Sequence, residues 1–307
     1  MAAIVSNRLK LPKTLKLVAS FLVLTAAGGG LGYAAARLAG LTASSGPFVD
    51  SCLAWSPGFG ALVTLRLHGG LQSWDFGFRR PRRRYVLFAI ALPPLVMTVV
   101  YGSVWISGLA SFAGRADRPS FTGVPVLALA GSGLALFLSA AGEELGWRGF
   151  LVPLLARSCD FPAVIWISWG CWFVYYLPAL LQRGFLSDVA TPFAFQLVAF
   201  GALLLALSVT QAWLRLRSAS LWPAILLHAA HNFFLREIFD PLTEVNPQSA
   251  WIIGRLGAGI AAAYLPVAWI LLIDGTRSHD GRSVTWRGID SHGAAAEHGD
   301  HGEQTER

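Results

Sequence analysis

TPFAFQLVAFGALLLALSVTQAW, at residues 191–213, is a stretch of the chain that carries no charged side chain. A helix needs about 20 apolar residues to cross the hydrocarbon core of a bilayer, and this stretch is long enough. Because lipid offers the backbone no hydrogen-bonding partner, a crossing segment must be a helix or belong to a closed barrel. The alternation of apolar and polar residues that is typical of barrel strands is not visible in the sequence. The stretch therefore predicts a membrane-spanning α-helix.

Similar apolar stretches recur along the rest of the chain. They lie roughly at residues 17–39, 46–66, 85–108, 124–155, 161–181, 219–236 and 251–273. Asp50, Ser56 and Pro57 interrupt the stretch at 46–66. The stretch at 124–155 is longer than one crossing requires, so it must tilt, bend or leave the membrane. The sequence predicts an all-α fold, a polytopic membrane helix bundle with about eight transmembrane helices.

The overall composition supports this interpretation. Charged residues make up 13% of the 307-residue chain and hydrophobic residues 54%, whereas about 25% of an ordinary soluble protein is charged. This argues against a soluble globular domain and against a disordered protein. Cys52, Cys159 and Cys171 lie in or beside apolar runs, without the spacing of a disulfide framework. The net charge of +7 fits basic loops on one side of a bilayer, so we expect a lipid bilayer and no nucleic acid as partner.

The basic residues predict the orientation of the chain. With eight spans, the following basic residues all fall on one face: Arg8, Lys10, Lys13, Lys16, Arg79, Arg80, Arg82, Arg83, Arg84, Arg157, Arg215 and Arg217. The positive-inside rule makes this face cytoplasmic, so we expect a multi-pass protein of the cell membrane with both termini cytoplasmic. The run at 17–39 is longer than the core of a signal peptide, which is about 7–15 residues, and we expect an uncleaved anchor.

The chain divides into a membrane domain and two tails. We expect a basic cytoplasmic tail at 1–16, a transmembrane domain at 17–274 with its motif core at 124–236, and a disordered polar tail at 275–307. The histidines of the last tail are His279, His292, His298 and His301. Metal binding by these histidines is the alternative to a solvated end.

Two clusters of polar residues interrupt the apolar stretches. One is GEELGWRGF at 142–150 and the other is HAAHN at 228–232. A charged side chain inside a membrane costs about 2.5–3.5 kcal/mol, so each cluster is a candidate functional site. Glu144 and Arg148 are four residues apart on one helix face, where they can form an ion pair that only fixes helix packing.

The surroundings expected for three of these residues indicate a catalytic role instead of a purely structural one: Glu143, His228 and Asn232. Glu143 projects about 100° around the helix from Glu144, and Trp147 stands where an i+4 partner would be. Its carboxylate must find a partner on another helix or water, or else act as a general base. His228 and Asn232 share a helix face and could form hydrogen bonds between helices. In a chain that also buries a glutamate pair, they suit the binding of a developing oxyanion.

A metal site is the main competing explanation for these residues. No HExxH helix is present, and a zinc site built from Glu143, His228 and His231 would need a fourth ligand or a water. The sequence has no motif for a nucleophilic serine or cysteine, and we interpret Cys171 as an ordinary buried thiol. We therefore expect no metal and no cofactor.

Together the two clusters resemble the motifs of a known family. EELGWRGFL at 143–151 and SLWPAILLHAAHN at 220–232 contain, in order, the EExxxR and HxxxN motifs of the CPBP family. These proteins are the CAAX prenyl protease and bacteriocin-processing membrane endopeptidases, also called Abi. Trp55-Ser-Pro57 and Gly70-Leu71 extend the similarity to roughly residues 45–240.

The resemblance implies a glutamic intramembrane endopeptidase that needs no metal. By this resemblance, Glu143 would activate the hydrolytic water. His228 and Asn232 would hold the oxyanion of the tetrahedral intermediate, while Glu144 and Arg148 would support the site.

The middle motif departs from the family pattern. That motif ends in a histidine, a hydrophobic residue and a proline, whereas WFVYYLP at 172–178 places Tyr176 at the histidine position. A phenol forms hydrogen bonds but is a poor general base at neutral pH. Three alternatives stay open: Tyr176 only positions Glu143, His231 supplies an imidazole, or the chemistry has been lost.

The function that we expect is a membrane endopeptidase acting on peptides or on the C-termini of membrane-associated proteins. The alternative is a catalytically silent family member that acts as a membrane scaffold, an immunity factor or a partner of another membrane protein. A small-solute transporter is a third hypothesis, and the absence of internal repeats in the sequence argues against it. The substrate's identity and the oligomeric state are not predicted.

Overall fold

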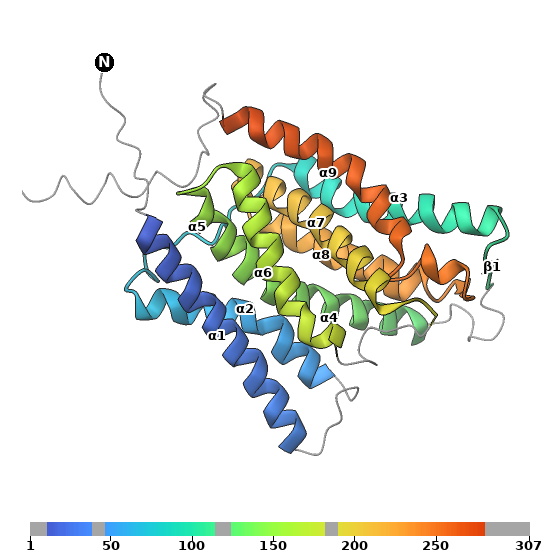
Figure 1. Ribbon diagram of the computed structural model, residues 1–307, viewed down its shortest axis with the longest axis horizontal. Coiled ribbons are helices and arrows are strands. Elements are labelled where there is room, and N and C mark those ends of the chain that lie inside the picture. The colour runs from blue at the N-terminus through green and yellow to red at the C-terminus, as the bar shows by residue number, and fades with distance from the viewer. Residues whose placement is uncertain (1–10, 39–46, 114–123, 182–189, 280–307) are drawn as a thin grey trace, which may run out of the picture.

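The computed structural model describes residues 11–38, 47–113, 124–181 and 190–279, which are almost entirely helical (Figure 1). The long helices are α1 (Leu11–Leu38), α2 (Pro47–Leu67), α3 (Arg83–Ile106), α4 (Val124–Gly146), α6 (Phe161–Leu181), α7 (Phe193–Ser218), α8 (Trp222–Phe233) and α9 (Ala258–His279). The shorter elements are α5 (Val152–Ala156), π-helical turns at Trp147–Leu151 and Phe234–Phe239, a 3₁₀ turn at Ser249–Trp251, and the antiparallel pair β1 (Ser111–Phe112) and β2 (Thr243–Glu244).

The predicted fold class, a polytopic helical membrane bundle, is confirmed. Within the described ranges, six helical segments are long and apolar enough to cross a membrane, and these belong to α1, α3, α4 with its continuation through α5, α6, α7 and α9. Helices α2 and α8 form where two further spans were predicted, but neither is among the six: α8 is too short, whereas α2 is as long as α6. Helix α8 has 12 residues, and α2 contains the polar Ser56 and the Pro57 that interrupt its apolar run.

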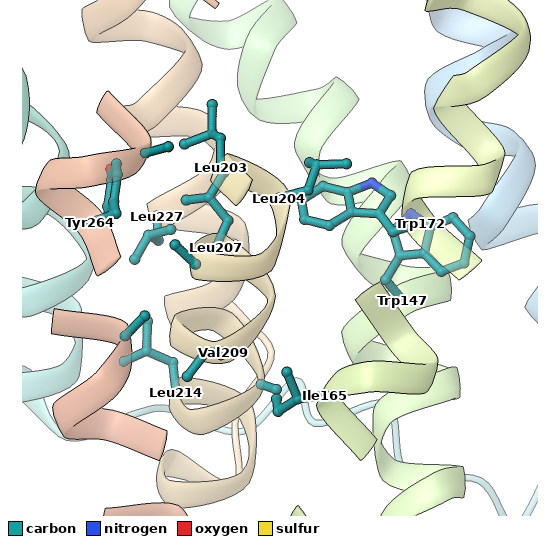
Figure 2. Close-up of a cluster of buried hydrophobic side chains, with 14 of the residues drawn as sticks. Trp147, Ile165, Trp172, Leu203, Leu204, Leu207, Val209, Leu214, Leu227 and Tyr264 are labelled. Atoms are coloured by element: carbon teal, nitrogen blue, oxygen red, sulfur yellow. The ribbon is translucent and has the colours of Figure 1, made fainter. Parts of the chain in front are cut away.

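Helices α7 and α8 lie at the centre of the bundle, with α1 and α2 on one side and α3 and α9 on the other (Figure 1). Helix α2 packs on α1 and α4, α8 packs on α3 and α4, and α7 packs on α6 and α9. Helix α7 is the most enclosed of the six candidate spans, and its leucines fill the space between Trp172 of α6 and Tyr264 of α9 (Figure 2). Apolar side chains such as Leu31 of α1 and Leu127 of α4 face outward, as lipid contact requires.

The long apolar run predicted at 124–155 is one continuous helical segment with a change of winding. Helix α4 passes into the π-helical turn Trp147–Leu151, and α5 then continues to Ala156. Within the turn, the N–H of Val152 donates to the carbonyl of Trp147, which is five residues earlier instead of four. Such turns occur frequently at functional sites, and this one includes Arg148 of the first polar cluster.

Glycines allow α4 to approach α2 closely beside the two glutamates. A methyl group at Gly146 would lie 2.4 Å from the backbone carbon of Pro57 and 2.5 Å from its Cβ. A methyl group at Gly142 would lie 2.8 Å from the carbonyl oxygen of Ala54. Because only glycine fits at both positions, this contact holds the segment that carries Glu143 at a set height against α2.

The terminal helices reach into the two predicted tails. Helix α1 begins at Leu11 and α9 ends at His279. The remaining parts of the tails, residues 1–10 and 280–307 with His292, His298 and His301, lie outside the described residues.

Replacement of Gly146 by alanine tests the contact between α2 and α4. We expect Gly146→Ala to lower the thermal unfolding temperature of the detergent-solubilised protein, because overpacking of a close contact costs about 1–3 kcal/mol. Gly131→Ala in the same helix is the matched control, since nothing lies within 4 Å of a methyl group there. Equal unfolding temperatures for the two variants would contradict the close contact.

Candidate active site

The two polar clusters of the sequence come together between α4, α6 and α8. Glu143, Glu144, Arg148 and His228 are 6%, 0%, 1% and 5% exposed, respectively. Four ionisable side chains are thus buried beside the apolar core of the bundle. Since an uncompensated charge in such a place is costly, each of these groups needs a specific partner.

Glu144 is the centre of the first set of contacts. Its Oε1 accepts hydrogen bonds from Arg148 Nη1 at 3.0 Å, His228 Nδ1 at 2.9 Å and Gln211 Nε2 at 3.2 Å. The ion pair predicted from the i,i+4 spacing of Glu144 and Arg148 is therefore present. These contacts join α4 and its π-helical turn to α7 and α8.

Glu143 finds its partners on α6. Tyr176 Oη lies 2.9 Å from Oε1 and 3.0 Å from Oε2 of Glu143, and Trp172 Nε1 donates to Oε2 at 3.1 Å. A carboxylate with no neighbour on its own helix was expected to need a partner elsewhere, and the middle motif supplies two donors. Tyr176, the tyrosine in the predicted middle motif, thus contacts Glu143 of the first polar cluster.

Trp172 links the two glutamate environments. The guanidinium carbon of Arg148 lies 4.1 Å from the centroid of the Trp172 ring, and the ring of His228 meets it edge-on at 5.7 Å. One indole therefore donates to Glu143, stacks on Arg148 and packs against His228. Trp172 also belongs to the buried apolar cluster in Figure 2.

The hydrogen bonds define the protonation of His228. Nδ1 must carry a proton, because the carboxylate of Glu144, ionised beside Arg148, can only accept. When Glu143 is ionised as well, a second proton on Nε2 of His228 brings the charges of Glu143, Glu144, Arg148 and His228 to a sum of zero, and a buried group of ions is least costly when its charges cancel. In this state Nε2 is a free donor, since no described residue forms a hydrogen bond with it.

Asn232 and His231 lie on different sides of α8. Asn232 is half-buried, one turn beyond His228 on the same helix face, and its side-chain amide forms no hydrogen bond with another described residue. His231 is buried, and its Nδ1 lies 3.2 Å from the hydroxyl of Tyr264 on α9. The hydrogen-bonding nitrogen of His231 is thus directed at α9, away from the α6 side where Glu143 is held.

The π-helical turn is held from outside by two donors. Trp74 Nε1 donates to the carbonyl of Gly149 at 3.0 Å, and Arg215 Nε donates to the carbonyl of Arg148 at 3.0 Å. A π-turn leaves carbonyl groups without their usual helical partner, and these two donors provide the missing hydrogen bonds. Arg215 was interpreted from the sequence as a residue that sets orientation, but it is 4% exposed and supports the site.

Sequence reasoning missed Trp172, Gln211, Trp74 and Arg215. Gln211 had a usable signal, because an amide in the middle of a membrane span needs a partner. A tryptophan in an apolar run is indistinguishable from core packing by sequence alone. For the residues that the structure describes, no group of three or more His, Cys, Asp or Glu is arranged to hold a metal ion.

The class of protein is defined by this segment of the chain. Residues 125–234, which contain both polar clusters and the middle motif, match the family model described as type II CAAX prenyl endopeptidase Rce1-like. That family is one of membrane proteases, and it belongs to the CPBP proteins that the motifs resemble. Residues 125–234 are therefore similar to the Rce1-like CAAX prenyl endopeptidases of the CPBP family. A comparison with curated proteins found no match to the chain.

Removal of Arg148 tests the buried ion pair. We expect Arg148→Met to lower the thermal unfolding temperature strongly, because loss of one partner of a buried pair costs about 3–5 kcal/mol. Arg66→Met, at an exposed arginine of α2, is the control and should have little effect. The double variant Glu144→Gln/Arg148→Met should be more stable than Arg148→Met, since no unpaired carboxylate remains. A double variant that is less stable would show that the pair is not the source of the effect.

Proposed function

We propose that this protein is an intramembrane endopeptidase that hydrolyses peptide bonds of peptides or of the C-termini of membrane-associated proteins. The observation that carries the proposal is the placement of Glu143. Its buried carboxylate is held by Tyr176 and Trp172, next to the set formed by His228, Glu144 and Arg148. A base and a donor of opposite charge, side by side in an apolar interior, suit the attack of water on a carbonyl.

The reaction divides between a base on α4, Glu143, and two hydrogen-bond donors on α8, His228 and Asn232. The Glu143 carboxylate takes a proton from a water molecule, and the water oxygen forms a bond to the carbonyl carbon of the peptide. The carbonyl oxygen becomes negatively charged and accepts hydrogen bonds from His228 Nε2–H and from the Asn232 amide. When the intermediate collapses, the C–N bond breaks and Glu143 returns its proton to the leaving amine.

Supporting residues keep these two groups in position. Glu144 accepts from Nδ1 of His228 and so leaves Nε2 as the ring nitrogen that can bond to the substrate. Arg148 balances the charge of Glu144 and is itself fixed by the Trp172 ring. Tyr176 orients Glu143 through its hydroxyl and takes no proton from water. Both Tyr176 and Asn232 are half-buried, whereas Glu143 and His228 are buried.

A catalytically silent membrane protein is the second candidate function, and one observation favours it. The hydroxyl of Tyr176 lies within hydrogen-bonding distance of both oxygens of Glu143. It therefore occupies a place where an attacking water would be expected to bind. If the hydroxyl stays there when a peptide binds, the site keeps its structure without the chemistry.

Glutamine in place of Glu143 tests the base. We expect Glu143→Gln to lower the cleavage rate of a peptide library by about 10²–10⁴-fold, because the amide cannot accept the proton. The measurement is product formation, followed by mass spectrometry, with purified protein in lipid nanodiscs. Glu244→Gln, at an exposed glutamate of β2, is the control with the same chemical change. Equal cleavage by Glu143→Gln and wild type would end the proposal.

Substitution of Tyr176 separates the two candidate functions. If the wild type is active, Tyr176→Phe should lower its cleavage rate by about 10–100-fold, since a hydrogen bond to a charged group contributes about 1.5–3 kcal/mol. A silent wild type should show no cleavage, whereas Tyr176→His should gain it by placing an imidazole beside Glu143. In both cases Tyr176→His/Glu143→Gln should be inactive, which confirms that any cleavage arises at this site.

A further inference from the structure

Residues 74–79, which we call the strap, cross the ends of three helices that build the site. The strap is tied to the π-helical turn by the bond from Trp74 to Gly149, and to α7 by Arg215, which donates to the carbonyl of Asp75 at 3.3 Å. At the start of α8, the N–H of Leu221 donates to the carbonyl of Gly77 at 2.7 Å. The strap is therefore a fixed part of the bundle.

Gly77 shows how tightly the strap is packed. Its φ of +85° is a conformation that glycine adopts readily, and a methyl group there would lie 2.7 Å from the guanidinium of Arg215. Ser220 Oγ and Trp222 Nε1 donate to the carbonyls of Arg79 and Phe78 at 2.6 and 3.3 Å. The backbone that leads into α3 is thereby held in one position.

An exposed cluster of arginines follows the strap at the start of α3. Arginine occupies every position from 79 to 84 except Pro81. Arg79 forms an ion pair with Asp75 at 2.9 Å, and Arg84 lies over the ring of Tyr85 at 4.7 Å. The other three are exposed, and we call Arg80, Arg82 and Arg83 the arginine surface.

The arginine surface is in an electrostatically unfavourable position unless an anion binds to it. A helix N-terminus disfavours positive charge, and no acidic residue stands in the first turn of α3 to compensate. Neighbouring like charges also repel each other. Basic residues anywhere in this loop would orient the protein in the membrane. The orientation therefore does not explain why the arginines gather at the start of α3.

The location of the surface indicates the chemistry of that anion. Helix α3 is a candidate membrane span that begins at Arg83, so the arginines lie at the boundary between lipid and water. Phe78, which is 55% exposed, packs against Trp222 at 5.8 Å beside them, and aromatic rings are enriched at this depth. Guanidinium groups bind phosphate through paired hydrogen bonds.

We propose that the arginine surface binds the phosphate groups of anionic phospholipids in the surrounding leaflet. The strap connects this surface to the carbonyls of the π-helical turn, so that bound lipid stabilises the segment carrying Arg148. The proposal stands without the proposed peptidase activity, because it concerns the lipid-facing end of the bundle and is measured by binding.

Lipid titration of the full chain tests the proposal. Purified protein in a neutral detergent is titrated with short-chain phosphatidylglycerol, short-chain phosphatidylcholine or inorganic phosphate, and the thermal unfolding temperature is recorded. We expect phosphatidylglycerol to raise it more than phosphatidylcholine does, with an apparent affinity that falls as salt is added. An equal effect of the two lipids would overturn the proposal, and an equal effect of inorganic phosphate would overturn the assignment to lipid.

Variants that remove equal charge at different places test which residues bind the lipid. Arg80→Gln/Arg82→Gln/Arg83→Gln should weaken phosphatidylglycerol binding by about fivefold per arginine, on the order of 100-fold in all. The control removes the same charge elsewhere, from Lys16, Arg66 and Arg236, which are exposed and far apart in the sequence. Equal weakening in the two triple variants would overturn the proposal. If the first triple variant does not fold, Arg82→Gln against Arg66→Gln makes the same comparison.

Discussion

The burial of Glu144 is the constraint on which the centre of this structure depends. A carboxylate with no exposed surface must be neutralised and hydrogen-bonded, or it would destabilise the fold by several kcal/mol. Arg148 provides the charge from the same helix, while His228 and Gln211 provide donors from α8 and α7. Three helices are therefore required to meet at one oxygen atom, which sets their relative heights more strictly than apolar contacts could.

Glu143 gains its environment from this arrangement. Once α4 is fixed by Glu144 and by the glycine contacts with α2, the neighbouring carboxylate is directed at α6. There it meets Tyr176 and Trp172, and the same indole covers Arg148. The two adjacent glutamates thus have different partners: Glu144 joins α4 to α7 and α8, and Glu143 contacts Tyr176 and Trp172 of α6. Their separation by 100° around the helix is the physical reason.

Local patterns predicted a large part of this molecule. Hydropathy located the helices, because the length of an apolar run is a property of the sequence alone. The spacing of Glu144 and Arg148 predicted their ion pair, since residues four apart on a helix must be neighbours. Local patterns gave no sign of the second role of Arg215: the sequence placed it among the basic residues that set orientation, and the structure shows that it is also buried, with its Nε donating to the carbonyl of Arg148. A loop charge and a buried arginine at a helix end have the same local sequence.

The sequence by itself determined the fold class, the positions of the helices and which side chains are costly to bury. These features depend on composition and on spacing within one helix. Only the tertiary structure decided that Tyr176 and Trp172 contact Glu143, that His231 is directed at α9, and that the strap supports the π-helical turn. Such contacts join residues that are distant in the chain, and they depend on how the helices rotate and slide against one another. Packing of whole surfaces sets that rotation, and no local pattern encodes it.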